Sequence, residues 1–315
     1  MKTIAITMGD PLGVGPEIAV QTLADSNIQR CCNPILVGNR DILVAAAKLC
    51  EIENFDTRFG HQIYHVPCDI TDPVSLAGTV QASGGQAAYD CICAAHHLCA
   101  SGKADAVATA PINKESLKAA KVPYIGHTEI FGALTQTHDP LTMFETTGLR
   151  IFFLTRHLSL RAACEAVSRE RVLDYIRRCT QALQNIGITE GTLAVAGLNP
   201  HSGEHGLFGD EEMDAIVPAV QQAQAEGYKV EGPVSADSVF HLAHKGRYAA
   251  VLSLYHDQGH IAAKTLDFHR TISVTHGLPY LRTSVDHGTA FDIAWKRIAD
   301  PVSMQEAVRL AALYA

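Results

Sequence analysis

The chain has 315 residues and a formal net charge of −8, which argues against general nucleic-acid binding because that needs clustered positive charge. Hydrophobic residues make up 47% of the chain and charged residues 18%, a composition that excludes a disordered or fibrous protein. This length exceeds the usual size of one hydrophobic core, so we expect two lobes.

The sequence contains no sign of export or membrane insertion. No apolar run approaches the roughly 18 to 20 residues that span a bilayer. Residues 1–10 lead directly into a strand pattern, without the apolar core of a signal peptide. Nine cysteines are present, none with C-x-x-C or zinc-ribbon spacing, which fits free thiols in a reducing compartment. We therefore expect a cytoplasmic protein with no membrane partner.

Short β-branched runs alternate with longer amphipathic stretches, which is the pattern of βαβ units in a mostly parallel sheet. The predicted strands cover residues 3–8, 34–37, 106–110, 141–145, 151–155, 193–198, 249–255 and 271–275. The predicted helices cover residues 16–23, 41–49, 84–100, 167–183, 211–224, 238–244 and 304–313. The chain shows no repeat, low-complexity segment or Pro/Ser linker, which favours a rigid two-lobed α/β enzyme with a cleft.

A glycine-rich turn follows the first predicted strand. Residues 8–17 could present backbone N–H groups and a helix N-terminus to an anion. Their spacing is G-x-x-x-G-x-G, which differs from the dinucleotide fingerprint G-x-G-x-x-G, and no Lys-Ser/Thr pair of a P-loop follows. The pattern alone favours a plain tight turn.

A second polar segment follows the strand predicted at residues 106–110. It runs through Asn113 and Lys114 and then reaches Gly126, His127 and Thr128. His127 and Thr128 could donate hydrogen bonds to phosphate oxygens. Thr128 could equally be the N-cap of a helix, with an acidic residue in its first turn. The sequence leaves both interpretations open.

Three histidines follow three separate predicted strands. His157 follows residues 151–155, His201 follows residues 193–198 and His256 follows residues 249–255. Ligands gather at the carboxyl ends of strands in open α/β sheets. One histidine in this position is usually an ordinary polar residue, but three could converge on a cation with coordination positions left for substrate.

Two cations complete the polar segments. Lys264 and Arg282 could hold a phosphate or carboxylate, with arginine as the bidentate partner. A locally basic pocket is the natural way for an acidic protein to bind a small anion. The alternative is a pair of solvated surface cations, which fits Arg282 less well because it lies among Gly, Ser, Thr and His residues.

Seven segments together resemble the 4-hydroxythreonine-4-phosphate dehydrogenase (PdxA) family. They are M-G-D-P-x-G-x-G-P-E at residues 8–17, T-A-P-x-N-K at 109–114, G-H-T-E at 126–129, H-L-x-L-R at 157–161, N-P-H-x-G-E at 199–204, Y-H-D-Q-G at 255–259 and R-T-S-V-D-H-G-T-A at 282–290. The motifs occur in order and reach nearly from end to end. Seven such motifs make the resemblance specific, although one alone would be weak.

The resemblance implies a homodimer of two-lobed α/β/α subunits with mostly parallel sheets, similar in fold to isopropylmalate and isocitrate dehydrogenases. The active site is expected in the cleft between the lobes, at the dimer interface. We place the first lobe at residues 1–125 plus 300–315. The second lobe, residues 126–299, would carry the metal ligands and the dimer interface. This family binds NAD without the Rossmann fingerprint.

The resemblance also assigns site residues. A divalent metal (Zn, Co, Ni, Mn or Mg) would be held by His157, His201 and His256, the last from the partner subunit. The phosphorylated substrate would be bound by His127, Thr128, Lys264 and Arg282, with Ser273 where the family usually has a substrate-binding asparagine. Asp237 matches a family acid near the metal, and we assign catalytic roles to Lys264 and Asp237.

The implied reaction is NAD-dependent oxidation of a 4-phosphorylated 3-hydroxy acid, followed by loss of CO₂. The substrate would be 4-hydroxy-L-threonine 4-phosphate, in vitamin B6 synthesis, or D-threonate or D-erythronate 4-phosphate, in sugar-acid breakdown. Residues 206–212, 259–264 and 291–295 favour the sugar acids, whereas Ser273, Arg270 and His276 depart from the family pattern. The alternatives are a dehydrogenase of an aromatic cis-dihydrodiol carboxylate, an NAD-independent metal hydrolase or lyase, and a non-catalytic metabolite-binding protein.

Overall fold

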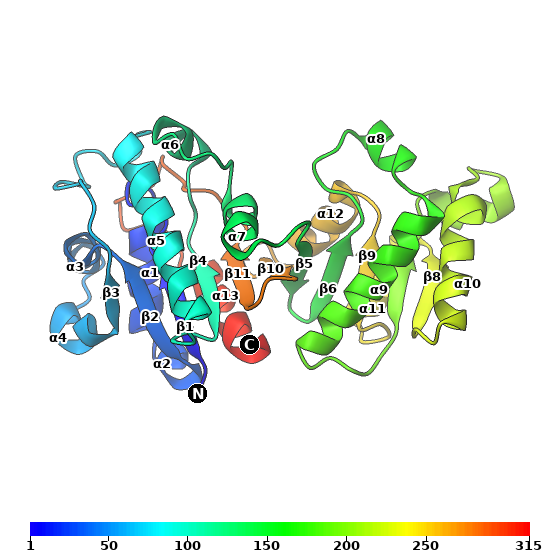
Figure 1. Cartoon of the computed structure of the whole chain (residues 1–315), viewed down its shortest axis with the longest axis horizontal. Helices are drawn as coiled ribbons and strands as arrows, with labels where there is room; N and C mark the ends of the chain where they lie inside the picture. Colours follow the sequence, from blue (N-terminus) through cyan, green and yellow to red (C-terminus); the bar gives the residue numbers. More distant parts are fainter. The chain divides into compact units, whose positions relative to one another are not determined.

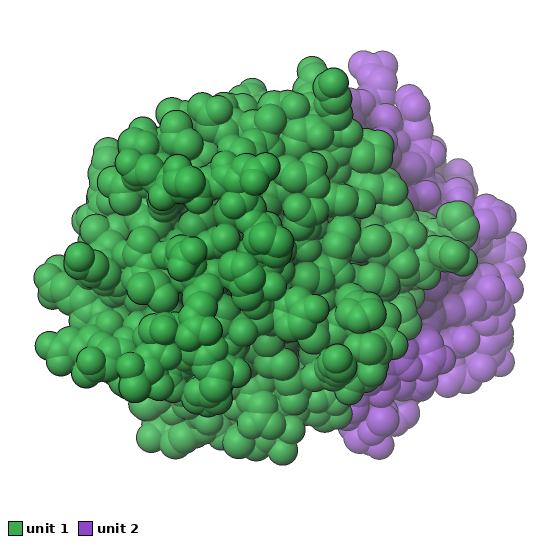
Figure 2. Space-filling view, turned by 60° about the vertical axis from the view of Figure 1, so that its left-hand side comes forward, with its two compact units in different colours: residues 1–140, 272–315 green, residues 141–271 purple.

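The computed structural model describes residues 1–315 and divides into two compact units. Unit 1 contains Met1–Pro140 and Ile272–Ala315, and unit 2 contains Leu141–Thr271 (Figure 2). The second unit is therefore shorter at both ends than the expected residues 126–299. The later boundary differs because the strand at residues 281–285 pairs in parallel with the strand at residues 106–109, inside unit 1.

Unit 1 is built on six strands in the order β3-β2-β1-β4-β11-β10 (Figure 1). Their bounds are Thr3–Thr7 for β1, Asn33–Gly38 for β2, Ile63–His65 for β3, Ala106–Thr109 for β4, Ile272–His276 for β10 and Leu281–Val285 for β11. All neighbouring pairs are parallel except β10 and β11, which form an antiparallel pair. Ile4, Ala5 and Ile6 are all fully buried, as expected for a strand covered on both faces.

Three of the helices of unit 1 begin at a side-chain cap. The helices of this unit are α1 (Gly15–Ala24), α2 (Ser26–Cys31), α3 (Arg40–Leu49), α4 (Phe55–Phe59), the 3₁₀ turn η1 (Gly60–Gln62), α5 (Ala82–Ala100), α6 (Lys114–Ala119), α7 (His127–Thr135) and α13 (Val302–Tyr314). The side chains of Asp25, Asn39 and Asn113 accept backbone N–H bonds at the starts of α2, α3 and α6. Such caps satisfy N–H groups that have no partner within a helix.

Unit 2 has five strands in the order β5-β6-β9-β7-β8. Its elements are β5 (Leu141–Thr146), β6 (Leu149–Phe153), α8 (Leu160–Glu165), α9 (Arg169–Asn185), β7 (Leu193–Ala196), η2 (Pro200–Gly206), η3 (Glu212–Ile216), α10 (Val217–Ala225), β8 (Val230–Val234), α11 (Ala236–His244), β9 (Ala250–Ser253) and α12 (His256–Leu266). The β6, β9, β7 and β8 strands run parallel, and β5 pairs antiparallel with β6. Residues from α11 and α12 pack against the sheet in one hydrophobic core.

The predicted α/β architecture with mostly parallel strands is confirmed. Every predicted strand and helix is present, and the strand ends differ by no more than two residues. The helix predicted at residues 211–224 is divided into the π-helical turn η3 and α10. Pro218 lies at the start of α10 and has no N–H, so it cannot donate the usual bond to the preceding turn.

A buried carboxylate fixes the end of the glycine-rich turn. Glu17 on α1 is fully buried, and it accepts the backbone N–H groups of Trp295 at 2.6 Å and Arg297 at 2.8 Å. The Trp295 indole in turn donates to the Pro11 carbonyl at 2.9 Å. Burial raises the pKa of the Glu17 carboxyl, and the two N–H donors oppose that shift. Residues 295–297 are thereby tied to α1 and to the turn before it.

We expect Glu17→Gln to lower the free energy of unfolding by about 1 to 3 kcal/mol, because its amide cannot accept both backbone N–H groups as a carboxylate does. The shift is measured from urea unfolding midpoints. The exposed carboxylate of Glu53 is a matched control, and Glu53→Gln should change stability by less than about 0.5 kcal/mol. Equal stability of the two variants would contradict the role given to Glu17.

Candidate active site

The residues predicted to act with a metal follow the carboxyl ends of four neighbouring parallel strands in unit 2. His157 follows β6, His256 follows β9, His201 follows β7 and Asp237 follows β8. The strands lie in the order β6-β9-β7-β8, so all four segments leave the sheet at one edge. This is the edge at which open α/β sheets bind ligands.

Two of the three histidines lie close together within the chain. The ring centroids of His157 and His256 are 6.2 Å apart. The Nδ1 atom of His256 is hydrogen-bonded to the Asp257 carboxylate at 2.6 Å, which leaves Nε2 for a ligand, as in carboxylate–histidine–metal arrangements. Imidazole nitrogens suit zinc, cobalt and nickel, so the donor type fits the expected metal.

His201 lies on a separate loop, where its ring centroid is 6.3 Å from that of Phe208. No group of three His, Cys, Asp or Glu side chains within this single chain has the geometry of a metal site. The three-histidine site therefore stays a prediction.

The strand ends that carry the histidines are joined by one amide side chain. Gln258 accepts the backbone N–H of Leu254 at 2.7 Å and donates to the Gly197 carbonyl at 2.8 Å. It thus connects the end of β9 to the end of β7. The Thr155 hydroxyl donates to the Leu254 carbonyl at 2.8 Å, which connects β6 to the same point. These hydrogen bonds fix the spacing between the ends of β6, β9 and β7.

His260 lies beside His256 and was not among the predicted site residues. Its ring stacks on that of His256 at 3.7 Å with 14° between the planes, and it also packs against Phe144 and Phe153. Burial, with a smaller effect from His256, lowers the pKa of His260 to about 3, so the ring is neutral. The four-residue spacing from His256 places both on one helix face, a signal present in the sequence.

The remaining predicted residues of unit 2 lie on helices and a turn. Lys264 continues the helix face of His256 and His260, and its Nζ lies 5.4 Å from the Phe268 ring centroid. Asp237 is exposed in the first turn of α11. Arg270, an unusual feature of the sequence, pairs with Asp267 at 3.4 Å in the turn after α12. Arg270 therefore stabilises that turn.

Arg282 is the centre of the second polar cluster, in unit 1. It is only 4% exposed. Its guanidinium donates to the hydroxyls of Thr275 and Thr109, each at 3.0 Å. The same group lies over the Phe131 ring, 5.5 Å from its centroid. These contacts orient a buried cation, which suits recognition of an oxyanion.

The start of α7 faces the same cation. His127 and Thr128 are its first two residues, and its N-cap is Gly126, which has no side chain to cap it. The interpretation of Thr128 as the N-cap is therefore wrong. The N–H groups at this helix end suit an anion. The His127 Nε2 atom is buried without a hydrogen-bond partner. Burial, and secondly the charge of Arg282, lower the pKa of His127 well below its usual value.

The pair of strands β10 and β11 places Ser273 on the side of Arg282. Thr275 pairs with Arg282, and Ser273 pairs with Ser284, so these side chains share one face of the sheet. His276 alternates to the other face. It is buried, and burial lowers its pKa to about 4. Of the two unusual residues in this strand, Ser273 is the one beside the arginine.

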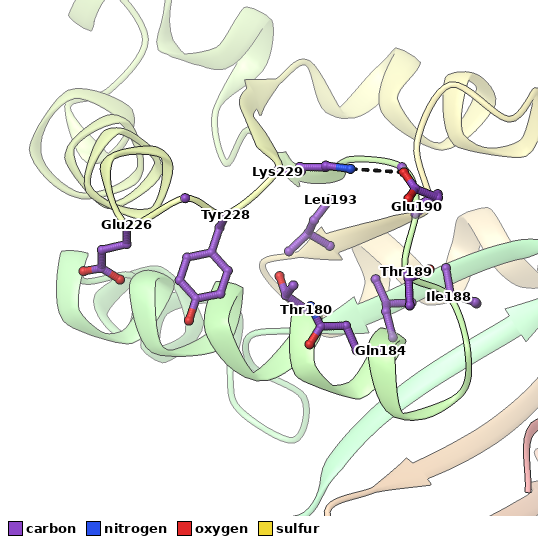
Figure 3. A pocket seen from close by; sticks show the side chains of 13 residues that line it. Thr180, Gln184, Ile188, Thr189, Glu190, Leu193, Glu226, Tyr228 and Lys229 are labelled. Carbon is purple, nitrogen blue, oxygen red and sulfur yellow. Dashed lines mark hydrogen bonds and ion pairs between the residues drawn. The ribbon is translucent and has the colours of Figure 1, made fainter.

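A cavity of about 230 Å³ lies at the opposite edge of the unit 2 sheet (Figure 3). It is lined by Thr180 and Gln184 of α9, and by Tyr228 and Lys229, which precede β8. Lys229 forms an ion pair with Glu190 at 3.1 Å. This cavity lies at the amino ends of β7 and β8, away from the histidines.

Comparisons with known proteins identify the family. The family model of the pyridoxal phosphate biosynthetic protein PdxA matches residues 30–311. The chain belongs to the PdxA family. It is 56% identical to a Clostridium botulinum protein whose provisional name is D-threonate 4-phosphate dehydrogenase, covering 99% of this chain and 96% of the relative. A protein of the same name from Symbiobacterium thermophilum is 58% identical, with the same coverage.

Solved structures of PdxA relatives share the fold. A Klebsiella pneumoniae structure named 4-hydroxythreonine-4-phosphate dehydrogenase is 39% identical with a TM-score of 0.86, covering 99% of this chain and 98% of that one. A terephthalate 1,2-cis-dihydrodiol dehydrogenase from Burkholderia xenovorans is 27% identical with a TM-score of 0.68, covering 99% and 98%. This member of the PdxA family is therefore a dehydrogenase. None of its helices is long and apolar enough to cross a membrane.

We expect Arg282→Lys to weaken binding of inorganic phosphate by about 10- to 100-fold, because an ammonium cannot replace the fixed pair of guanidinium donors. Isothermal titration calorimetry measures the effect. Arg270→Lys is a matched control, since Arg270 is an exposed arginine bound to Asp267, and its phosphate affinity should equal that of the wild type. Equal affinities for all three proteins would refute the anion site.

Proposed function

We propose that this protein is an NAD- and divalent-metal-dependent dehydrogenase that oxidises the C3 hydroxyl of a 4-phosphorylated 3-hydroxy acid, with loss of CO₂. The observation that carries the proposal is the position of His157, His256 and His201 after three adjacent parallel strands in a chain of the PdxA family. We place the protein in the cytoplasm.

In unit 2, His157 and His201 would hold the divalent cation together with His256, the last supplied by the partner subunit. When bound, the cation lowers the pKa of the substrate hydroxyl and stabilises negative charge on oxygen, while NAD accepts the hydride. Asp257 keeps the His256 ring in the tautomer that exposes Nε2. Lys264 and Asp237 are the proposed proton carriers.

In unit 1, Arg282, His127 and Thr128 would bind the phosphate of the same substrate. The Arg282 guanidinium is already oriented by the hydroxyls of Thr275 and Thr109, so little ordering remains to be done on binding. Binding energy at the phosphate, which does not react, can then fix the position of C3. Ser273, on the same face, is the proposed contact to the rest of the substrate.

The working form is proposed to be a homodimer with a shared active site. Large apolar side chains are exposed close in sequence to the three histidines, namely Leu158, Leu160, Leu207, Phe208, Met213 and Ile261. Exposed apolar side chains gathered near a polar site are typical of a protein interface. A second copy of the chain would cover them and bring its own histidine to the site.

We propose D-threonate or D-erythronate 4-phosphate as the substrate. Support comes from the relatives named for D-threonate 4-phosphate, which are 56% and 58% identical. The relative named for 4-hydroxythreonine 4-phosphate is 39% identical, and the dihydrodiol dehydrogenase is 27% identical. The buried Arg282 beside the start of α7 further favours a phosphorylated substrate over a dihydrodiol.

The test is the formation of NADH by metal-loaded protein offered D-threonate 4-phosphate, D-erythronate 4-phosphate and 4-hydroxy-L-threonine 4-phosphate in parallel. We expect turnover to be fastest with a sugar-acid phosphate. A preference for the amino acid would overturn the substrate assignment alone. Absence of NADH with all three, in protein shown to bind NAD and metal, would overturn the proposed reaction.

We expect His201→Ala to abolish both cobalt binding and turnover, because two imidazoles do not hold a divalent cation as three do. Calorimetric titration with Co²⁺ measures the first effect. His205 lies on the same loop and is also exposed, so His205→Ala is a matched control that should bind cobalt normally. Full cobalt affinity in His201→Ala would refute the metal site.

A further inference from the structure

Glu212 is a buried carboxylate whose hydrogen bonds all go to the segment before His201. It is the first residue of the π-helical turn η3 and is 2% exposed. One oxygen, Oε1, accepts the backbone N–H groups of Leu198 and Asn199, each at 2.7 Å. The other oxygen, Oε2, accepts the side-chain amide of Asn199 at 2.8 Å. Glu212 therefore binds the chain between β7 and His201.

The segment held in this way has an uncommon backbone. His201, Ser202, Gly203, Glu204 and His205 all have left-handed conformations, with φ of 53°, 54°, 78°, 42° and 58°. Only Gly203 adopts such a conformation without strain, because the others carry a Cβ atom that crowds the neighbouring carbonyl. Local sequence preference therefore does not explain the loop, and contacts from outside it must hold it.

The loop also closes directly onto the carboxylate. A Cβ atom at Gly203 would lie 2.8 Å from Glu212 Oε2, so glycine allows the backbone to approach there. Glu211, the neighbouring carboxylate, accepts the Asn199 side-chain amide at 2.7 Å but no backbone N–H of the loop. The two adjacent glutamates thus differ in burial and in bonding, since Glu212 is buried and accepts backbone N–H groups, whereas Glu211 is half-buried and accepts only a side chain.

We propose that Glu212 is a positioning residue that sets the place of the His201 imidazole by fixing the backbone at Leu198 and Asn199. The inference rests on the proposed metal-binding role of His201. Glu212 touches neither substrate nor metal in this account. Glu212 acts on His201 through the backbone, because Pro200 alone separates Asn199 from His201. The ring of Pro200 fixes its φ, so the position of the anchored Asn199 determines where the left-handed turn begins.

The test compares Glu212→Gln with Glu211→Gln, which remove the same charge from adjacent residues. In Glu212→Gln we expect cobalt affinity, measured by calorimetry with Co²⁺ alone, to fall by about 10- to 100-fold, as for other residues that orient a ligand. Glu211→Gln should stay within about threefold of the wild type, the size of the effect of a partly exposed charge.

A second measurement does not depend on metal. Amide hydrogen exchange in the metal-free protein should be about tenfold faster or more at Leu198 and Asn199 in Glu212→Gln, because their acceptor is weakened. Glu211→Gln should leave that exchange unchanged. If Glu212→Gln does not fold, Glu212→Asp is measured in its place, since its shorter side chain keeps the charge but draws the accepting oxygen away from both backbone N–H groups.

The outcomes separate this inference from the proposed function. Wild-type cobalt affinity in Glu212→Gln together with lost affinity in His201→Ala would overturn the positioning role and leave the metal site standing. Equal losses in Glu212→Gln and Glu211→Gln would show a general effect of charge and would also overturn it. Wild-type affinity in His201→Ala would instead overturn the proposed function.

Discussion

The site in unit 2 depends on the parallel pairing of β6, β9, β7 and β8. Parallel pairing brings the carboxyl ends of all four strands to one edge, although their following residues are far apart in the chain. His157, His256 and His201 leave the sheet there. Gln258 and Thr155 then join the three strand ends by hydrogen bonds. The placement of the histidines is thus a property of the sheet, refined by two side chains.

Unit 1 provides a different kind of environment. Arg282 is buried and oriented by two hydroxyl groups and an aromatic ring, and the uncapped start of α7 lies at the same point. Such a cluster suits the binding of an oxyanion. The two units therefore divide the proposed tasks, with anion recognition on one and cation binding on the other. The segment after Thr271 returns the chain to unit 1 and brings Arg282 with it.

Much of this arrangement is readable from the sequence because it depends on local signals. Apolar runs predict the central strands. A polar residue directly after such a run is predicted to lie at the carboxyl end of that strand. The edge strand β8 was missed because it contains Gly232 and Pro233, which are tolerated at an edge but typical of turns. Helix α12 was missed because Gly259 lies inside it. That glycine allows close packing, since a Cβ there would lie 2.6 Å from the Phe153 ring.

Other features depend on contacts that no local pattern encodes. The bonds from Leu198 and Asn199 to Glu212 join residues 13 and 14 positions apart, and the left-handed loop lies between them. The boundary of unit 2 depends on β11 pairing with β4, whose residues are widely separated in sequence. The polar composition of β11, Leu-Arg-Thr-Ser-Val, does not predict a strand, although this strand is largely buried. These are tertiary effects that override local propensity.

The most direct test of the account is anomalous X-ray scattering at the cobalt edge from crystals grown with Co²⁺. We expect one strong peak per active site, within bonding distance of the imidazoles of His157, His201 and His256, the last from the partner subunit. A peak bound by other side chains, with these three rings free of metal, would contradict the account.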